Sequence, residues 1–352
     1  MNRLFRASVL SWLRIQAVAM PRVTALVATA ALVLGQAAPS LAYLKFGVQA
    51  GGRPVALTWG RTPVRYFVTD RAGGGLGAPD LQGALGRAFA TWQAVPTASI
   101  AYEFVGFTSA LPFEDDGQST IGFAARPDLD RVLASTSILL DDATGEILEA
   151  DIFFNTTFQW SVATAGEPSK FDLESVALHE IGHMSGLGHS ALGETELRAE
   201  GGRRVLGAEA VMFPIAFPAG NTSARSLRAD DIAGISDLYP DAGFDEATGS
   251  ISGRVTKGGR GLFGAHVAAF DPARGTLIGN FSLDDQGRFS IAGLSPGPYV
   301  VRVEPLDDGD IDSFFNASAR IDLDFRVKFV ERLVVVPRGG DSGTVEISVV
   351  AK

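Results

Sequence analysis

Cysteine is absent from this chain of 352 residues, and histidine and methionine occur only four times each. Without cysteine the chain forms no disulfide, and it offers no cysteine to carry a lipid anchor. Stability must therefore come from packed cores, for which a hydrophobic content of 46% is ample. The length is sufficient for two domains.

Acidic residues are missing from the segment 1–42, which carries four arginines and then an apolar run over Val23–Leu34. Ser40-Leu41-Ala42 places small residues on both sides of a leucine, as in a signal-peptide cleavage site. We therefore expect a secretory signal peptide, with Met20 as an alternative start. An uncleaved membrane anchor is the other interpretation, but the apolar run has about 12 residues where a membrane span needs about 20.

Basic residues are in the minority over the rest of the chain. Cleavage after Ala42 leaves 26 basic against 40 acidic residues, a net charge near −14. Such a surface repels a phosphate backbone, which argues against nucleic acid as a partner. We expect a secreted protein, extracellular or periplasmic, that is not held at a membrane after the cleavage.

Three of the four histidines lie within the eleven residues His179–His189, which read HEIGHMSGLGH. His179 and His183 are four residues apart, so on a helix both imidazoles lie on one face, one turn apart. Two neutral imidazoles at this spacing can hold a zinc ion. Glu180 is better placed to reach a metal-bound water than to bind the metal itself.

A glycine makes a third ligand reachable. Gly186 follows His183 by three residues and can adopt a positive φ, so the chain can turn and bring His189 back beneath the metal. Three nitrogens and one open position are the form of a catalytic zinc site. The other interpretation is a core helix that contains histidines by chance. The offsets of the glycine and the third histidine reduce the probability of that interpretation to about one per cent.

The pattern HExxHxxGxxH resembles that of the metzincin clan of zinc endopeptidases. Three further features resemble the matrixins, the family of the matrix metalloproteinases. Ser190 follows the third histidine, Val211–Pro214 resembles the Met-turn, and Ser226–Ile235 resembles the start of the C-terminal helix. The resemblance spans roughly residues 55–240.

This resemblance implies a secreted zinc metalloendopeptidase, a hydrolase that cleaves peptide bonds in extended protein or peptide substrates through zinc-bound water. It implies one catalytic zinc on His179, His183 and His189, with Glu180 as the general base. It also implies that Met212 forms a floor below the three imidazoles.

The resemblance extends to the substrate pocket. The segment 214–228 is implied to wall the pocket for the side chain that follows the cleaved bond. Ile215 and Phe217 within it indicate an apolar pocket.

The chain also departs from the matrixin pattern. Matrixins are kept latent by a prosegment thiol, which this chain lacks, and the histidines of a second, structural zinc are missing too. We expect that second zinc site to be lost. Matrixins bind calcium, and the acidic turn Glu114–Gly117 is either a calcium loop or a solvated turn, so calcium stays an open cofactor without assigned ligands.

An insertion longer than matrixins usually have separates His189 from Met212. Within it, Glu194–Arg204 is expected to form a short helix. The insertion either shapes access to the cleft or is a surface excursion.

For the domain 43–245 we expect an α+β fold, a metzincin-type mixed twisted sheet with a zinc-binding active-site helix. The expected elements are strands at 64–68, 100–107, 133–139 and 150–155, a helix at 80–95 capped by Asp80, the zinc helix capped by Ser169 or Asp172, and a last helix capped by Asp230 or Asp231 that ends near Tyr239. By resemblance, strand 133–139 is the sheet edge that pairs with substrate.

Short alternating strands with Gly and Pro turns begin at Ile251, after a linker at 241–249, and predict an all-β sandwich domain over 246–352. Residues 250 to about 305 resemble the carboxypeptidase regulatory-like domain, a transthyretin-like fold. His266 has no partner ligands nearby and is interpreted as structural.

No catalytic constellation is visible in the sandwich sequence. The sandwich either contacts a surface or a partner protein, or it stabilises the enzyme. The alternative function for the whole chain is a catalytically silent, exported binding or adhesion module that uses the sandwich.

Overall fold

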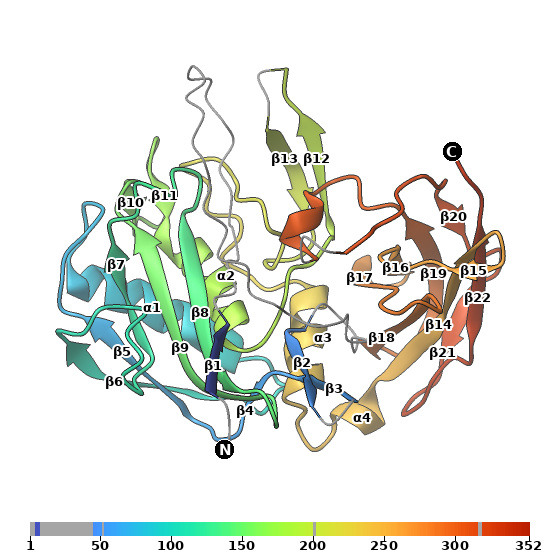
Figure 1. Ribbon diagram of the computed structural model, residues 1–352, viewed down its shortest axis with the longest axis horizontal. Coiled ribbons are helices and arrows are strands. Elements are labelled where there is room, and N and C mark those ends of the chain that lie inside the picture. The colour runs from blue at the N-terminus through green and yellow to red at the C-terminus, as the bar shows by residue number, and fades with distance from the viewer. Residues whose placement is uncertain (1–3, 8–44, 51–52, 200–201, 316–318) are drawn as a thin grey trace.

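The computed structural model describes residues 4–7, 45–50, 53–199, 202–315 and 319–352, and it contains two bodies of β structure with helices between and beside them (Figure 1). The expected signal peptide lies outside the described residues except for Leu4–Ala7. No helix in the described part of the chain is both long and apolar enough to span a membrane.

The first body is built on a mixed sheet in the order β1-β8-β9-β7-β5-β6, with β4 also paired to β9. Strands β5, β6, β7 and β9 run parallel, whereas β8 is antiparallel to β9. The strands are β1 (Leu4–Ala7), β4 (Thr58–Trp59), β5 (Val64–Thr69), β6 (Tyr102–Thr108), β7 (Thr120–Ala124), β8 (Ala134–Asp141) and β9 (Glu146–Asn155). The α+β fold with a mixed twisted sheet is thus confirmed, and β7 is a strand that the sequence did not predict.

The outer edge of β8 is occupied by the chain's own N-terminal residues. Leu4–Ala7 forms the antiparallel strand β1, with Leu4 opposite Asp141 and Ala7 opposite Ile138. This edge is therefore able to accept an extended backbone.

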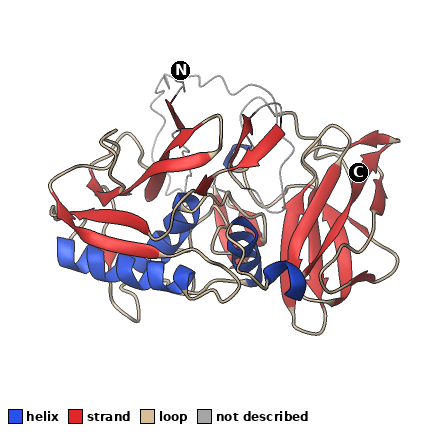
Figure 2. Cartoon of the chain, turned by 90° about the horizontal axis from the view of Figure 1, so that it is seen from below, coloured by secondary structure: helices blue, strands red, loops and turns tan. Residues whose placement is uncertain are grey.

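Two helices pack on this sheet and bury its inner face (Figure 2). Helix α1 (Ala78–Gln93) contributes Leu81, Leu85 and Trp92, all fully buried, at the spacing of one helical face. Asp80 does not occupy the capping position: Gly77 does, and its N–H donates to Asp80 Oδ2 over 3.1 Å. Helix α2 (Leu173–Met184) lies beside α1, and all of its residues except Ser175 are buried.

The last helix of the first body, α3 (Ala229–Leu238), has Arg228 at its N-cap. The expectation that Asp230 or Asp231 occupies this position was wrong, because both lie in the first turn. Asp231 still serves the helix start, since its carboxylate accepts the Arg228 N–H at 2.8 Å. The expected linker contains a short helix, α4 (Phe244–Ala247).

The insertion after the third histidine is a β-hairpin. Its strands are β12 (Gly193–Leu197) and β13 (Arg203–Ala208), paired antiparallel. The expected short helix over Glu194–Arg204 was therefore wrong. Charged residues alternate with others here, and the described part of the hairpin is stabilised by cross-strand pairs such as Arg204 with Glu196 at 2.6 Å.

The second body is an all-β sandwich, as expected. One sheet has the order β15-β14-β18 with β22 on β14, and the other has β17-β16-β19-β20 with β21 on β19. Its elements are β14 (Gly249–Lys257), β15 (Arg260–Gly261), β16 (His266–Asp271), β17 (Thr276–Phe281), β18 (Arg288–Leu294), β19 (Gly297–Glu304), η1 (Ile311–Ser313), β20 (Lys328–Phe329), β21 (Val334–Val336) and β22 (Val345–Val349). Alternating buried side chains from both sheets fill the core.

Helix α3 lies between the two bodies and packs on β17 and β18 of the sandwich (Figures 1 and 2). Ala233 of this helix belongs to the sandwich core, and Asp230 Oδ1 accepts the Gly279 N–H of β17 at 2.9 Å. The two bodies therefore share buried apolar and polar contacts. The remaining short strands are β2 (Gly47–Ala50), β3 (Arg53–Ala56), β10 (Trp160–Ser161) and β11 (Phe171–Asp172).

Candidate metal centre

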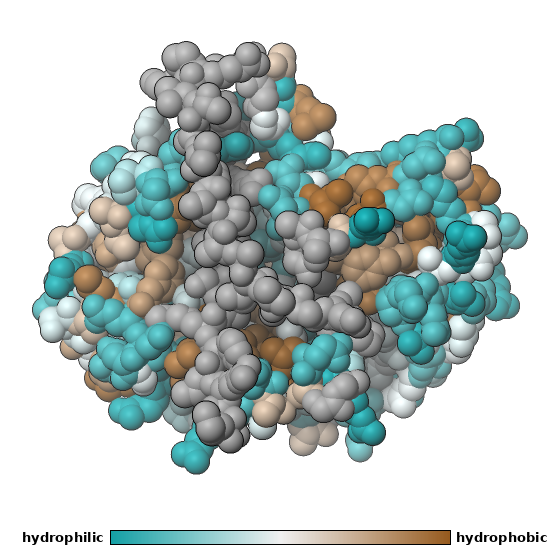
Figure 3. Space-filling view, in the orientation of Figure 1, coloured by the Kyte–Doolittle hydropathy of each residue, from teal (hydrophilic) through white to brown (hydrophobic). Residues whose placement is uncertain are grey.

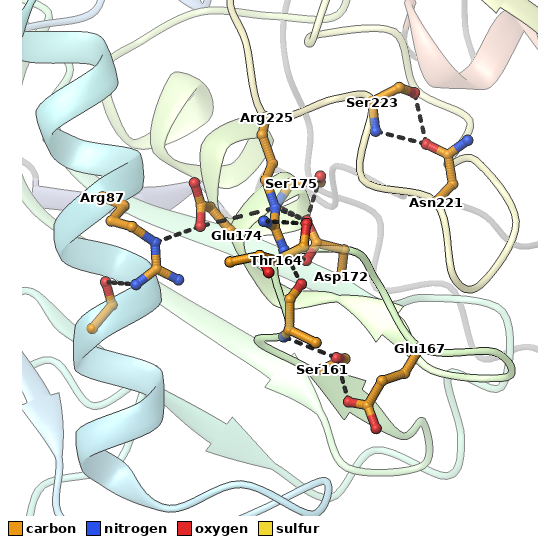
Figure 4. Close-up of polar contacts among 12 residues, drawn as sticks. Arg87, Ser161, Thr164, Glu167, Asp172, Glu174, Ser175, Asn221, Ser223 and Arg225 are labelled. Carbon is orange, nitrogen blue, oxygen red and sulfur yellow. Dashed lines mark hydrogen bonds and ion pairs between the residues drawn. The ribbon is translucent and has the colours of Figure 1, made fainter.

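Helix α2 is fixed at its N-terminus by Asp172, one of the two caps that the sequence allowed. Asp172 Oδ2 accepts the Ser175 N–H at 2.9 Å, and Arg225 contacts both carboxylate oxygens, at 2.5 and 2.9 Å (Figure 4). Glu174 in the first turn pairs with Arg87 of α1 at 2.6 Å. These contacts join α1, α2 and the segment around residue 225, so the helix is held rigidly in place.

The three histidines of the motif converge. His183 Nε2 lies 3.0 Å from His179 Nε2 and 3.2 Å from His189 Nε2, and all three residues are buried. Each Nδ1 faces a backbone carbonyl oxygen: Val211 O at 2.7 Å for His179, Leu187 O at 2.8 Å for His183 and Ser313 O at 2.5 Å for His189. This is the one such cluster of three or more ligating side chains found among the described residues.

The donor set fits a zinc ion. A carbonyl acceptor places the proton on each Nδ1, so each Nε2 presents a lone pair to the others. Burial, followed by the charge of His189, lowers the pKa of His179 to about 3, and burial lowers the pKa of His183 well below its usual value. Neutral lone pairs at this distance cannot bond to one another, whereas tetrahedral zinc separates nitrogen ligands by about 3.3 Å.

Gly186 makes the turn that the sequence predicted. Its φ is +97°, and a Cβ at this position would lie 2.3 Å from Leu57 O. The Leu187 N–H returns to Gly182 O at 3.0 Å, which ends the helix and directs the following residues back toward its histidines. The tight packing and the positive φ both require glycine here.

The segment around Met212 lies against this turn and the helix. Met212 is 3% exposed, and its Sδ would be 2.3 Å from a Cβ added at Gly182, which stands between the first two histidines. Val211 N–H and Met212 N–H donate to the two oxygens of Asp231, at 2.8 and 3.1 Å. Asp231 therefore positions the carbonyl that orients His179, a role that the sequence did not reveal.

Glu180 is fully buried, and its contact with the sheet was also missed from the sequence. Thr136 of β8 donates from Oγ1 to Glu180 Oε2 at 2.7 Å. A threonine within an expected strand carries no signal of this contact, because the pairing joins residues 44 positions apart. The bond fixes the orientation of the Glu180 carboxyl group.

A cavity lies beside His179, and most of the residues that line it, from α2 and from the segment 208–224, are apolar. Its apolar lining includes Val176, Val211, Phe213, Ile215, Ala216 and Phe217. Ile215 and Phe217, from which the sequence predicted an apolar substrate pocket, both line this cavity.

The inserted hairpin lines a second cavity together with the sandwich. This cavity is bounded by Leu197, Gly202 and Arg203 of the hairpin, by Ile215, and by Asp310 and Ser313 of the sandwich. The hairpin therefore lies near Ser313, whose carbonyl oxygen contacts His189, and its role in access to the cleft stays a prediction.

Two other features singled out in the sequence are not members of the three-histidine cluster, although His266 lines a cavity together with His189. In the acidic turn Glu114–Gly117, Asp116 Oδ1 accepts the Gln118 N–H at 2.9 Å, a local turn contact, and calcium stays without assigned ligands. His266 is 3% exposed at the start of β16, where its Nδ1 lies 3.0 Å from Glu304 Oε1.

Comparison with known proteins shows that the first body is similar to a known family. Residues 58–199 match the matrixin family model. The chain is 31% identical over 181 residues to Metalloendoproteinase 1-MMP of Arabidopsis thaliana, covering 47% of this chain and 39% of that protein. It is 46% identical over 71 residues to Metalloendoproteinase 1 of Glycine max, covering 20% and 18% of the two chains. Matrilysin of Rattus norvegicus is 35% identical over 97 residues, covering 28% and 29%.

The chain spans at most 39% of the length of these curated relatives. The matched region includes the three histidines and ends within the inserted hairpin. This region is therefore matrixin-like, as the sequence predicted, and it contains the three-histidine cluster. The sandwich lies outside the match, and its likeness to the carboxypeptidase regulatory-like domain stays a prediction.

Proposed function

We propose that this protein is a secreted zinc metalloendopeptidase that hydrolyses peptide bonds in extended protein substrates, with Glu180 as general base. The observation that carries the proposal is the convergence of three Nε2 lone pairs, each fixed by a carbonyl on the opposite ring nitrogen. Export is supported by the basic and then apolar sequence of residues 1–42.

His179, His183 and His189 would hold zinc through Nε2. A zinc ion in this position supplies Lewis-acid polarisation of the scissile carbonyl and acidifies a water molecule. The Glu180 carboxylate then accepts the proton of the attacking water and delivers it to the leaving amine. Thr136 keeps the carboxylate in one orientation during both transfers.

The substrate backbone would lie along β8. Support comes from β1, which already pairs antiparallel with β8 from Leu4 to Ala7. Removal of residues 1–42 frees this edge for a peptide in the same extended form. The side chain after the cleaved bond would enter the apolar cavity beside His179.

We propose domain limits of 43–245 for the catalytic part and 246–352 for the sandwich. The alternative function is a catalytically silent, exported binding module. The buried Glu180 with its hydrogen bond from Thr136 argues for the enzyme, because a silent module needs no base.

Casein zymography of the secreted protein, with and without a zinc chelator, tests the proposal. We expect cleavage that the chelator abolishes and added zinc restores. A zinc-loaded protein that leaves casein and a diverse peptide library intact would support the binding module instead.

A further inference from the structure

We propose that the sandwich completes the zinc site, because its Ser313 carbonyl and Phe314 ring position the third ligand, His189. The inference deepens the proposed function and rests on it for the identity of the metal. Under this proposal the sandwich contributes directly to the metal centre and is not a separate module that binds a partner.

The first observation is the source of the three carbonyl acceptors. Val211 O and Leu187 O come from the same body as the histidines, and both lie close to the helix. Ser313 O comes from the sandwich, 124 residues after His189 in the sequence. A metal-ligating imidazole needs such a partner on its other nitrogen to fix its tautomer and ring orientation. For His189 the structure supplies this partner from the second body.

The second observation is the aromatic packing behind this contact. The Phe314 ring meets the His189 ring edge-on, with centroids 6.2 Å apart at 73°. Phe314 is packed in turn on Phe281 of β17, at 5.6 Å. Phe281 and Phe315 are buried in a small apolar cluster, to which Ala191, two residues after His189, also contributes. Hydrophobic side chains gather on the sandwich side of the space-filling view (Figure 3).

The third observation is that the inserted hairpin binds the loop of residues 306–315, which contains Ser313 and Phe314. Thr195 donates from its backbone N–H to Asp308 Oδ1 at 2.7 Å and from Oγ1 to Asp308 O at 3.0 Å. Arg203 Nε lies 3.6 Å from Asp310 Oδ1. In Figure 1 the short helix η1 stands next to β12 and β13, in agreement with these contacts. The loop of residues 306–315 is thus held on both sides of Ser313.

The test compares two variants that remove a phenylalanine from the same apolar cluster. Phe314→Ala removes the ring that contacts His189, whereas Phe263→Ala removes a ring that contacts Phe315. Zinc dissociation constants are measured on the full mature chain by chelator competition. We expect a rise of about tenfold or more for Phe314→Ala, the usual effect of losing an outer-shell partner, and less than about twofold for Phe263→Ala.

A spectroscopic readout separates positioning from simple loss of stability. The chain has 4 histidines, so the imidazole region of a ¹⁵N spectrum is simple. In the zinc-loaded wild type we expect a protected Nδ1–H signal for each of the three ligands, and in Phe314→Ala the loss of the His189 signal alone. Ser313→Ala should change neither readout, because the backbone carbonyl makes the contact.

Equal zinc affinity in wild type and Phe314→Ala, or equal losses in the two phenylalanine variants, would overturn the inference. If Phe314→Ala does not fold, Gly309→Ala replaces it, since a Cβ there would lie 2.5 Å from the Phe314 ring and displace it. Casein cleavage by the wild type is scored separately. If the wild type cleaves casein but the variants bind zinc with unchanged affinity, only the positioning role is refuted. If the variants bind zinc with altered affinity but the wild type does not cleave casein, only the proteolytic function is refuted.

Discussion

Thr136 donates its hydroxyl hydrogen to Glu180 Oε2 over 2.7 Å, and this bond connects the strand β8 to the proposed general base. Both residues are buried, with Thr136 1% exposed and Glu180 fully enclosed. The strand along which substrate would lie and the carboxylate that would move the proton are therefore held together directly.

Replacing this threonine tests the bond. Thr136→Val keeps the shape but removes the donor, and hydrogen bonds to charged groups contribute about 1.5–3 kcal/mol. We expect denaturant unfolding to show a loss of that order and kcat on a peptide substrate to fall about tenfold. Thr136→Ser should retain both.

The matched control for that experiment is Thr120→Val. Thr120 is also buried in the sheet, at 1% exposed, but its Oγ1 has no hydrogen-bond partner. Its replacement should be neutral or stabilising. A similar loss in both valine variants would mean that the effect comes from repacking and not from Glu180.

Glu180→Gln removes the base while preserving the size of the side chain. We expect zinc content, measured by atomic emission, to stay at one ion per chain, and kcat to fall by roughly 10²–10⁴, the usual contribution of general base catalysis. Cleavage of casein at the wild-type rate would exclude Glu180 as the base.

Gly186→Ala tests the turn between the second and third histidines. The φ of +97° and the approach to Leu57 O at 2.3 Å leave no room for a Cβ. We expect a lower zinc affinity and a loss of at least about 1–3 kcal/mol in stability from backbone strain alone. Gly117→Ala is the control, because its φ is +78° but nothing lies within 4 Å of the added Cβ. Equal behaviour of the two variants in zinc binding would contradict the proposed bend.

The buried Asp230 predicts a pH dependence. Burial raises its pKa from 3.8 to about 7, aided by Asp231 and opposed by hydrogen bonds from Ser190 and Gly279. Between these values the folded chain retains a proton that the unfolded chain releases, so this group reduces the free energy of unfolding as the pH rises from about 4 to 7. The slope is at most about 1.4 kcal/mol per pH unit.

Asp230→Asn removes that contribution and keeps an oxygen for the Gly279 N–H. Since the lowered pKa values of His179 and His183 act in the opposite direction, the difference between variant and wild type is the quantity to measure. We expect the variant to gain stability relative to the wild type as the pH rises through this window, and no further change above it. A difference that is flat with pH would show that Asp230 titrates normally.

Much of the fold was predictable from local patterns. Residues that are near one another in the sequence predict the buried face of α1, the alternating strands of the sandwich and the two possible caps of α2. The errors occurred where tertiary contacts decide. The hairpin β12–β13 replaced an expected helix because its two strands pair with each other and because Thr195 and Arg203 contact Asp308 and Asp310 of the sandwich.

The sequence by itself determined the proposed metal-binding motif, because a helix fixes the His179–His183 spacing and a glycine with positive φ fixes the return of His189. Only the tertiary structure decided what surrounds that motif. Three hydrogen bonds join residues that are between 19 and 124 positions apart: Thr136 to Glu180, Met212 to Asp231 and His189 to Ser313. Such contacts leave no periodicity or spacing in the chain, since they arise only when separate elements pack together and their buried polar groups require partners.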